Sequence, residues 1–146
     1  MTALVDDEDF EWLSKWRWSY MNVGYAVRGE MKNKKSTMTL MHRSIMKAPT
    51  GMEVDHINGN RLDNRKENLR ICTHAQNCYN YKNKGNSTKG VHWEKHANKW
   101  RARIRYNGQK IHLGYFKSQK DALDAYNSAA KKYHGEFVNL DSLAGT

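Results

Sequence analysis

The fold of this chain is decided by residues Val54 to Asn77, which read V-D-H-I-N-G-N-R-L-D-N-R-K-E-N-L-R-I-C-T-H-A-Q-N. Residues 52–56 predict a short strand that ends on an Asp-His pair. Residues 57–67 hold Gly59 among several asparagines and aspartates, a composition that favours a loop. The stretch therefore begins as a strand that delivers two chemically active side chains to the start of a loop.

The second half of the stretch predicts another strand and a helix. Leu69 and Ile71 share one face of the run N-L-R-I-C at residues 68–72, which indicates a strand. Thr73 and Gln76 have the spacing of a capping box, so a helix is expected to begin there and to run to residue 81. The predicted order is strand, loop, strand, helix.

The residue types in this stretch suit phosphodiester hydrolysis. Such a reaction needs a base that takes a proton from water and a positive centre on the developing charge. Histidine, with a reference pKa of about 6.5, accepts a proton near neutral pH. Carboxylate and amide oxygens are hard ligands suited to Mg²⁺ or Mn²⁺.

Each of these residues also has an ordinary structural explanation. Asp55 and His56 alone fit a turn with a hydrogen-bonded histidine, and Asn77 alone fits an exposed helix position. His74 is interpreted as a capping-turn or phosphate-contacting residue. The loop asparagines are interpreted as loop formers; they are Asn58, Asn60 and Asn64. Only the joint spacing favours a site.

The stretch resembles the HNH nuclease motif in its His-Asn-Asn form, as found in phage homing endonucleases with the ββα-metal fold. The resemblance implies that Asp55 and Asn77 coordinate one divalent metal ion, Mg²⁺ or Mn²⁺. It implies that His56 is the general base and that Asn68 holds the loop and His56 in position. Asn77 replaces the family's third histidine, which fits the Asn-bearing subgroup and does not suit zinc. The implied products carry 3′ hydroxyl and 5′ phosphate ends.

The residues before this stretch read as a tryptophan-rich front piece. The predicted elements are strands over 16–20, 24–28 and 37–41, a solvated turn over 31–36 and a short helix over 42–47. Trp12, Trp16 and Trp18 are interpreted as core residues, with base stacking as the alternative.

Residues 91–140 predict a second unit built on a hairpin. Asn107-Gly108 lies between two alternating runs, the strongest short-range hairpin signal. The predicted pairs are Arg105 with Lys110, Ile104 with Ile111, Arg103 with His112 and Ala102 with Leu113. This register places apolar residues on one face and basic residues on the other. Residues 91–94 predict a third antiparallel strand.

A helix is expected to follow the hairpin, over residues 118–134. Ser118 caps it, small and aromatic residues recur at helical spacing, and Gly135 ends it. This unit resembles the plant ethylene-response-factor type of DNA-binding domain, which implies that its sheet enters the major groove. The residues then expected to bind DNA are His92, Trp93, Arg101, Arg103, Arg105, Lys110 and His112. An arginine usually stands at the position of His92, so no base preference transfers.

Composition limits the class of partner. Lysine and arginine number 25 against 15 acidic residues, a net charge of +10. A polyanion is therefore expected, and nucleic acid is favoured over a membrane because there is neither a basic amphipathic helix nor a long apolar run. Cys72 and Cys78 are too few for a disulfide framework or a zinc knuckle, and no secretory signal is recognised, which favours a reducing cytoplasm.

The sequence thus predicts an α+β protein in three parts. These are an HNH ββα-metal nuclease domain with a β-rich front piece (1–81), a basic linker (82–90) and an ethylene-response-factor-type domain (91–146). The expected function is a metal-dependent endonuclease of phage homing type that nicks double-stranded DNA as a monomer; a double-strand cut would need a dimer or two nicks. The expected location is the cytoplasm, that of the host if a phage encodes the chain.

Two alternatives stay open at this point. One is a DNA-binding regulator with an inert nuclease core, which the intact set of Asp55, His56, Asn68 and Asn77 disfavours. The other is an RNA substrate, which is disfavoured because the major groove of A-form RNA is too narrow for a sheet.

Overall fold

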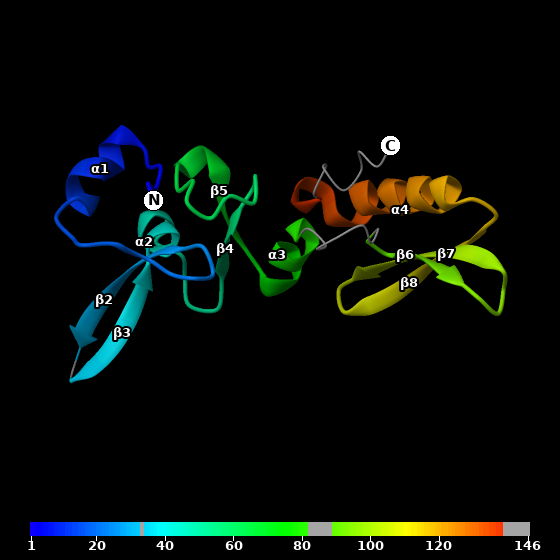
Figure 1. Cartoon of the computed structure of the whole chain (residues 1–146), viewed down its shortest axis with the longest axis horizontal. Coiled ribbons are helices and arrows are strands. Elements are labelled where there is room, and N and C mark those ends of the chain that lie inside the picture. Colours follow the sequence, from blue (N-terminus) through cyan, green and yellow to red (C-terminus); the bar gives the residue numbers. More distant parts are fainter. Residues whose placement is uncertain (33, 82–88, 139–146) are drawn as a thin grey trace. The chain divides into compact units, whose positions relative to one another are not determined.

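Three antiparallel sheets and four α-helices lie within residues 1–32, 34–81 and 89–138, which the computed structural model describes (Figure 1). By the contacts within each part, the chain divides into two units, Met1–Asn77 and Cys78–Thr146. This is the α+β class that the sequence predicts.

The first unit holds two of the sheets. Its elements are α1 (Asp7–Leu13), β1 (Ser19–Tyr20), β2 (Ala26–Lys32), β3 (Lys35–Leu40), α2 (Met41–Met46), β4 (Glu53–His56), a 3₁₀ turn (Lys66–Asn68), β5 (Leu69–Cys72) and α3 (His74–Asn80). β2 lies between β1 and β3, and β4 pairs with β5. The predicted order of strand, loop, strand and helix across β4, β5 and α3 is confirmed. The last residues of α3 belong to the second unit.

The capping box at the start of α3 is also confirmed. The Thr73 backbone N–H donates to Gln76 Oε1 at 2.8 Å, and the Gln76 backbone N–H donates to Thr73 Oγ1 at 3.3 Å. These reciprocal bonds satisfy two backbone donors that a helix start leaves without partners.

Two expectations for the front piece are wrong, and one helix, α1, was not anticipated. The first turn of α1 holds Asp7, Glu8 and Asp9, where the helix dipole favours negative charge. The strand expected over 16–20 reduces to β1, because the Trp16 backbone N–H still donates to Leu13 O as the chain turns off α1. The turn expected over 31–36 is mostly strand, since β2 and β3 continue pairing as far as Lys32 and Lys35.

The core of the first unit lies among α1, α2 and the strands. Its buried apolar residues are Leu13, Ala26, Met41, Ile45, Val54 and Leu69. Trp12 and Trp18 pack against this core, as expected, and the Trp18 indole N–H donates to Leu13 O at 2.9 Å. Trp16 is instead 51% exposed, with the Arg28 guanidinium 3.9 Å from its ring centre. This core carries β4, so it fixes the strand that ends on Asp55 and His56.

The second unit is a three-stranded sheet covered on one face by a helix (Figure 1). Its elements are β6 (Val91–Glu94), β7 (Lys99–Tyr106), β8 (Gln109–Phe116), α4 (Gln119–His134) and a 3₁₀ turn (Gly135–Phe137). Ser118 Oγ accepts the backbone N–H of Asp121 at 3.0 Å, and Gly135 ends α4 at a positive φ of 54°. The predicted cap and stop of this helix are confirmed.

The hairpin register is confirmed for three pairs and wrong for the fourth. Arg105 lies opposite Lys110, and the pairing continues in register to Arg103 and His112. A bulge then shifts the ladder, so that Ala102 lies opposite Gly114 and not Leu113. The extra residue is accommodated in β8, where Gly114 adopts a φ of 135° that a side chain would disfavour.

The sheet has the two faces that the register predicts. Val91, Ala102 and Ile104 are buried against α4, while Arg103 and Arg105 are exposed. Trp93 pairs with Trp100, their ring centres 5.5 Å apart, on the face of Val91 and Ala102. Trp93 therefore does not lie with the arginines.

The predicted linker over 82–90 falls mainly on residues 82–88, which lie outside the described residues. That prediction, and the domain bounds that depend on it, stay predictions. No helix among the described residues is long and apolar enough to cross a membrane.

Gly90 makes a close approach that can be tested. A Cβ there would lie 2.3 Å from a ring carbon of Tyr126 and 2.4 Å from Arg103 O, and φ is +73°. Gly90→Ala should therefore lose stability both to strain, about 1–2 kcal/mol, and to overpacking, about 1–3 kcal/mol more.

Gly108→Ala is the matched control, because Gly108 has a φ of +78° and nothing within 4 Å of the added Cβ. Urea unfolding of both variants should show the larger loss of unfolding free energy for Gly90→Ala. Equal losses would mean that the contact with Tyr126 relaxes freely.

Candidate functional site

The pairing of β4 with β5 places the candidate residues on two faces. Asp55 lies opposite Arg70 and His56 lies opposite Leu69. Because successive residues of a strand point to opposite faces, Glu53 and Asp55 share one face and Val54 and His56 share the other. Asp55 and His56 are each only 5% exposed.

His56 is oriented by Asn64. His56 Nε2 lies 3.3 Å from Asn64 Oδ1, and Asn64 Nδ2 donates to Leu62 O at 3.2 Å. Because the amide nitrogen of Asn64 donates to the Leu62 carbonyl, the amide oxygen faces His56. An amide oxygen can only accept a hydrogen bond. His56 Nε2 therefore carries the proton in the neutral ring, and Nδ1 is the atom that accepts one.

A second histidine and a tyrosine surround the His56 ring. The ring centres of His42 and His56 are 4.9 Å apart in an edge-to-face arrangement, and that of Tyr25 is 5.0 Å from His42 and 6.0 Å from His56. Burial, with the nearby His56 and Arg43, lowers the pKa of His42 to about 3. Burial also lowers the pKa of His56. Both rings are therefore neutral at neutral pH, the state that a general base needs.

Asp55 is held by Arg70. The guanidinium Nη2 and Nε lie 2.6 Å and 2.8 Å from Asp55 Oδ2. Both side chains are largely buried, with 13% of Arg70 and 6% of Asp55 exposed. A buried pair of this kind fixes the carboxylate in direction, because moving either partner alone would leave a charge uncompensated.

Glu53 bridges two residues of α3. Its Oε2 accepts from Asn77 Nδ2 at 2.6 Å, and its Oε1 lies 2.8 Å from His74 Nδ1. The hydrogen bond from Asn77 is the main cause that lowers the pKa of Glu53. A carboxylate can only accept, so the nitrogen of the Asn77 amide faces Glu53 and Oδ1 faces elsewhere. His74 therefore lies against the Glu53 carboxylate.

Asn68 ties together the two ends of the loop. Its Oδ1 accepts the Asn58 backbone N–H at 3.0 Å, and its Nδ2 donates to Asp63 O at 2.8 Å. The Asp63 carboxylate accepts from Arg65 Nε at 2.8 Å and from Asn58 Nδ2 at 2.9 Å. These bonds, led by that from Arg65, lower the pKa of Asp63 to about 2.

The N-terminal segment closes the loop from outside. The Leu4 backbone N–H donates to Leu62 O and its carbonyl accepts from Asn64, both at 2.8 Å. Further along, the Lys66 backbone N–H donates to Asp6 Oδ2 at 2.7 Å. Asn64, which is fully buried, therefore owes its fixed position to residues about 60 positions earlier in the chain.

The structure thus brings the four candidate residues onto β4 and the elements next to it. Asp55 lies on the same face of β4 as Glu53, and Asn77 donates a hydrogen bond to Glu53. His56 lies on the opposite face, and Asn68 braces the loop that follows. Within the described residues, no group of three or more His, Cys, Asp or Glu is gathered as a metal site.

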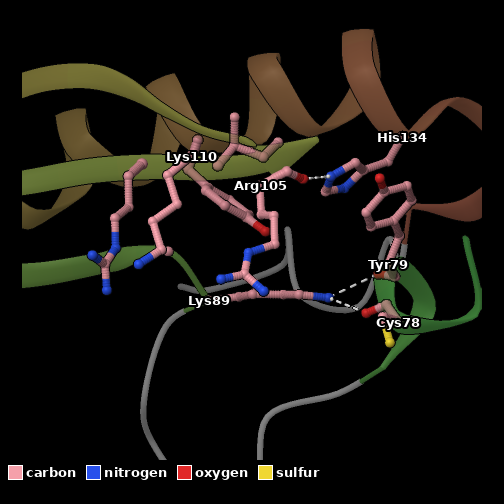
Figure 2. Close-up of a pocket in the computed structure, with 10 residues that line it drawn as sticks. Cys78, Tyr79, Lys89, Arg105, Lys110 and His134 are labelled. Carbon is pink, nitrogen blue, oxygen red and sulfur yellow. Dashed lines mark hydrogen bonds between the residues drawn. The ribbon is translucent and has the colours of Figure 1, made fainter. Parts of the chain in front are cut away.

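The exposed sheet face of the second unit carries the other candidate set. Arg101 is engaged, with Nε 2.9 Å from His92 Nε2 and Nη1 2.8 Å from Glu94 Oε2. Arg103, Arg105, Lys110 and His112 are exposed, and Arg105 and Lys110 extend from the sheet on the same side (Figure 2). The His112 ring lies 4.8 Å from that of Tyr115.

Comparison with curated proteins finds an uncharacterised HNH endonuclease of Acanthamoeba polyphaga mimivirus. It is 31% identical over 139 residues, which cover 93% of this chain and 72% of that protein. The chain belongs to the HNH endonuclease family. The family model described as HNH endonuclease matches residues 46–79, which contain β4, β5 and most of α3. HNH endonucleases are phosphodiester hydrolases that act on DNA and typically use a divalent metal ion.

Two further relatives come from phage and prophage. Protein 3.8 of Escherichia phage T7 is 30% identical over 98 residues, 63% of this chain and 78% of that protein. An SPbeta prophage-derived protein of Bacillus subtilis (strain 168), named as an HNH homing endonuclease, is 42% identical over 60 residues, 37% of this chain and 35% of that protein. No solved structure matches the chain significantly.

Sequence reasoning missed several residues that lie around the candidate site. Asn64 was interpreted as a loop former, and Glu53, Arg70 and His42 were not singled out. Alternation along β4 carries a signal for Glu53, since it precedes Asp55 by two residues. His42 and Asn64 carry no local signal, because their contacts with His56 are made by other elements.

The buried His42 should make stability depend on pH. Its pKa is about 3 in the folded protein and near 6.5 in the unfolded chain. Above pH 6.5 the ring is neutral in both states; below it, only the unfolded chain gains a proton. The free energy of unfolding should fall on acidification from pH 6.5 towards 3, by up to about 1.4 kcal/mol per pH unit from this residue.

His42→Phe keeps a ring at this position and removes the titration. Urea unfolding at pH 7, 6 and 5 should give a flatter stability curve for the variant than for the parent. Parallel curves would show that the folded protein protonates His42 as readily as the unfolded chain does.

Proposed function

We propose that this HNH endonuclease hydrolyses duplex DNA by nicking, with Asp55 and Asn77 as the ligands of one Mg²⁺ or Mn²⁺ ion. The observation that carries the proposal is the arrangement around β4. It combines a neutral, oriented histidine with a carboxylate and an amide whose oxygen faces away from Glu53. The homing type is proposed from the prophage relative named as such.

The chemistry of the donor set fits a hard divalent cation. Asp55 offers carboxylate oxygen, and Asn77 offers the single oxygen of an amide whose nitrogen is bonded to Glu53. Oxygen donors of this kind suit Mg²⁺ or Mn²⁺, which keep several waters, and do not suit zinc. The bound cation would supply positive charge to the scissile phosphate and to the leaving 3′ oxygen.

His56 is proposed as the general base. The proton on Nε2 is committed to Asn64, so Nδ1 takes the proton from the attacking water. The low pKa that burial gives His56 keeps the ring available at neutral pH. Because the base and the metal ligands lie on opposite faces, the scissile phosphate would lie across the end of β4.

Asn68 and Glu53 are proposed as positioning residues. Asn68 keeps the loop after His56 closed through Asn58 and Asp63. Glu53 selects the atom that Asn77 presents, in the way that outer partners orient metal ligands. Neither residue is proposed to touch the substrate.

The C-terminal unit is proposed to hold duplex DNA on the exposed face of its sheet, as the ethylene-response-factor resemblance implies. The proposed contacts are His92, Arg101, Arg103, Arg105, Lys110 and His112. Trp93 is left out, because its pairing with Trp100 puts it on the other face. A monomer would cut one strand at each binding event.

A plasmid assay tests the catalytic assignment. The parent chain should convert supercoiled plasmid to open circles in Mg²⁺ or Mn²⁺, and His56→Ala should cut at least about 100-fold more slowly with DNA binding retained. Asn64→Ala should give an intermediate loss, because the ring remains but its tautomer is no longer fixed.

Two outcomes would contradict this assignment. Intact DNA binding by the parent without nicking in either metal would mean that the nuclease core is inert. Equal loss of binding and cleavage in His56→Ala would mean that the histidine is structural.

The role of Glu53 is tested by metal binding in the absence of DNA. Glu53→Ala should weaken Mn²⁺ binding, measured by calorimetry, by about 10- to 100-fold, because the Asn77 amide is then free to turn. The exposed Glu11 gives the control: Glu11→Gln also removes one negative charge and should leave the affinity unchanged. Equal affinities for the parent and Glu53→Ala would remove Glu53 from the metal site.

A further inference from the structure

A pocket of about 320 Å³ opens in the C-terminal unit, where the β7–β8 hairpin meets Cys78 and Tyr79 (Figure 2). Its volume is at the lower end of the range for pockets that bind small molecules. Of the described residues that line it, four are lysine or arginine and none is Asp or Glu. The basic residues are Lys89, Arg103, Arg105 and Lys110. The part of the wall that the structure describes therefore gathers positive charge without a carboxylate.

The strand register forces this charge together. Arg105 lies directly opposite Lys110, and Arg103 lies on the same face of β7 two residues earlier. Like charges in opposed positions destabilise a hairpin. Within the described residues, no ion pair with a carboxylate involves these three side chains, whereas Arg101 has Glu94 at 2.8 Å. An anion in the pocket would relieve the repulsion.

Lys89 removes the negative charge that would otherwise face such an anion. Its Nζ donates to the carbonyl oxygens of Cys78, Tyr79 and Tyr81 at 3.2, 2.8 and 3.1 Å. These carbonyls lie at the C-terminal end of α3, the negative end of a helix. The amine of Lys89 is engaged there, as Figure 2 shows, so Arg103, Arg105 and Lys110 are the lining cations left to meet an anion.

The wall beside these cations is held firmly. The Tyr79 ring stacks on His134 with ring centres 3.8 Å apart and an interplanar angle of 8°. The Tyr79 hydroxyl accepts the Asn107 backbone N–H at 3.3 Å, and His134 Nε2 donates to Arg105 O at 3.0 Å. These contacts tie residue 79, the hairpin turn and the end of α4 together. The pocket is thus a preformed feature of the C-terminal unit.

We infer that this pocket binds a backbone phosphate of duplex DNA, gripped by Arg103, Arg105 and Lys110. A planar guanidinium matches phosphate oxygens in pairs, and a lysine adds a point charge. The inference rests on the proposed DNA binding by the C-terminal unit and makes it specific. It assigns Arg103 and Arg105 to the backbone and not to bases.

The basic face of the sheet then has two parts with different roles. Around the hairpin end, a phosphate contact gives affinity without sequence preference. At the other end, Arg101 is fixed by His92 and Glu94, and a guanidinium fixed in direction suits recognition of a base edge. Position on the DNA would come from the first set and sequence preference from the second.

Salt dependence of DNA binding separates the two roles. Binding is measured with the full chain carrying His56→Ala, which prevents cleavage, on several unrelated duplexes of equal length at 50–300 mM KCl. Adding Arg105→Gln should weaken binding roughly tenfold on every duplex. It should also reduce the slope of log K against log salt by about 1. Lys110→Gln should act in the same way.

Arg101→Gln is the matched control, since it removes the same charge from the same strand. It should change the ranking of the duplexes more than Arg105→Gln does. An unchanged salt slope in both Arg105→Gln and Lys110→Gln, or a loss confined to some duplexes, would overturn the phosphate assignment. No DNA binding by the His56→Ala chain would instead refute the proposed function.

A second measurement distinguishes DNA phosphate from a small phosphorylated ligand. Inorganic phosphate is added to the full chain without DNA, at constant ionic strength, and thermal unfolding is followed. Millimolar phosphate should raise the unfolding temperature little. Stabilisation that Arg105→Gln abolishes, with an unchanged DNA salt slope, would assign the pocket to a free ligand and overturn the inference. Because Arg105 is exposed, Arg105→Gln should leave the fold intact, and circular dichroism checks this.

Discussion

The antiparallel pairing of β4 with β5 is the constraint on which the rest of the N-terminal unit depends. It fixes the faces of four successive residues, so Glu53 and Asp55 go to one side and Val54 and His56 to the other. Val54 is anchored in the core, so β4 cannot slip by one residue without exposing it. The chemistry of the site follows from this register.

Around that strand, partners that can only accept hydrogen bonds decide which atom His56 and Asn77 present. Asn64 Oδ1 leaves the proton of His56 on Nε2, and the Glu53 carboxylate turns the nitrogen of Asn77 towards itself. Arg70 gives Asp55 a fixed direction. Because most of these groups are buried, misplacing one would leave a polar atom unsatisfied, which is costly. Order at the site is therefore coupled to the stability of the fold.

Within the described part of the C-terminal unit, some of the charged side chains lie close together without a partner of opposite charge. Its hairpin holds Arg105 opposite Lys110 without a carboxylate partner among the described residues, while Arg101 is paired with Glu94. Unrelieved positive charge on a rigid surface is suited to a polyanion, and paired charge is suited to a fixed orientation. The nuclease unit leaves no such charge on Asp55 and His56, because Asp55 is paired with Arg70 and the His56 ring is neutral.

Elements that depend on local signals could be predicted from the sequence. The capping box at Thr73, the Asn107-Gly108 turn and the Ser118 cap each act over a few residues, and the α+β class follows from them. Local pattern could not reveal the bulge at Ala102 or the contacts that Leu4, His42 and Asn64 make around His56. Those contacts join residues far apart in the chain, and only burial in one core makes them favourable. Which asparagine braces the loop, which one faces His56 and which atom each presents follow only from the packing of these distant residues.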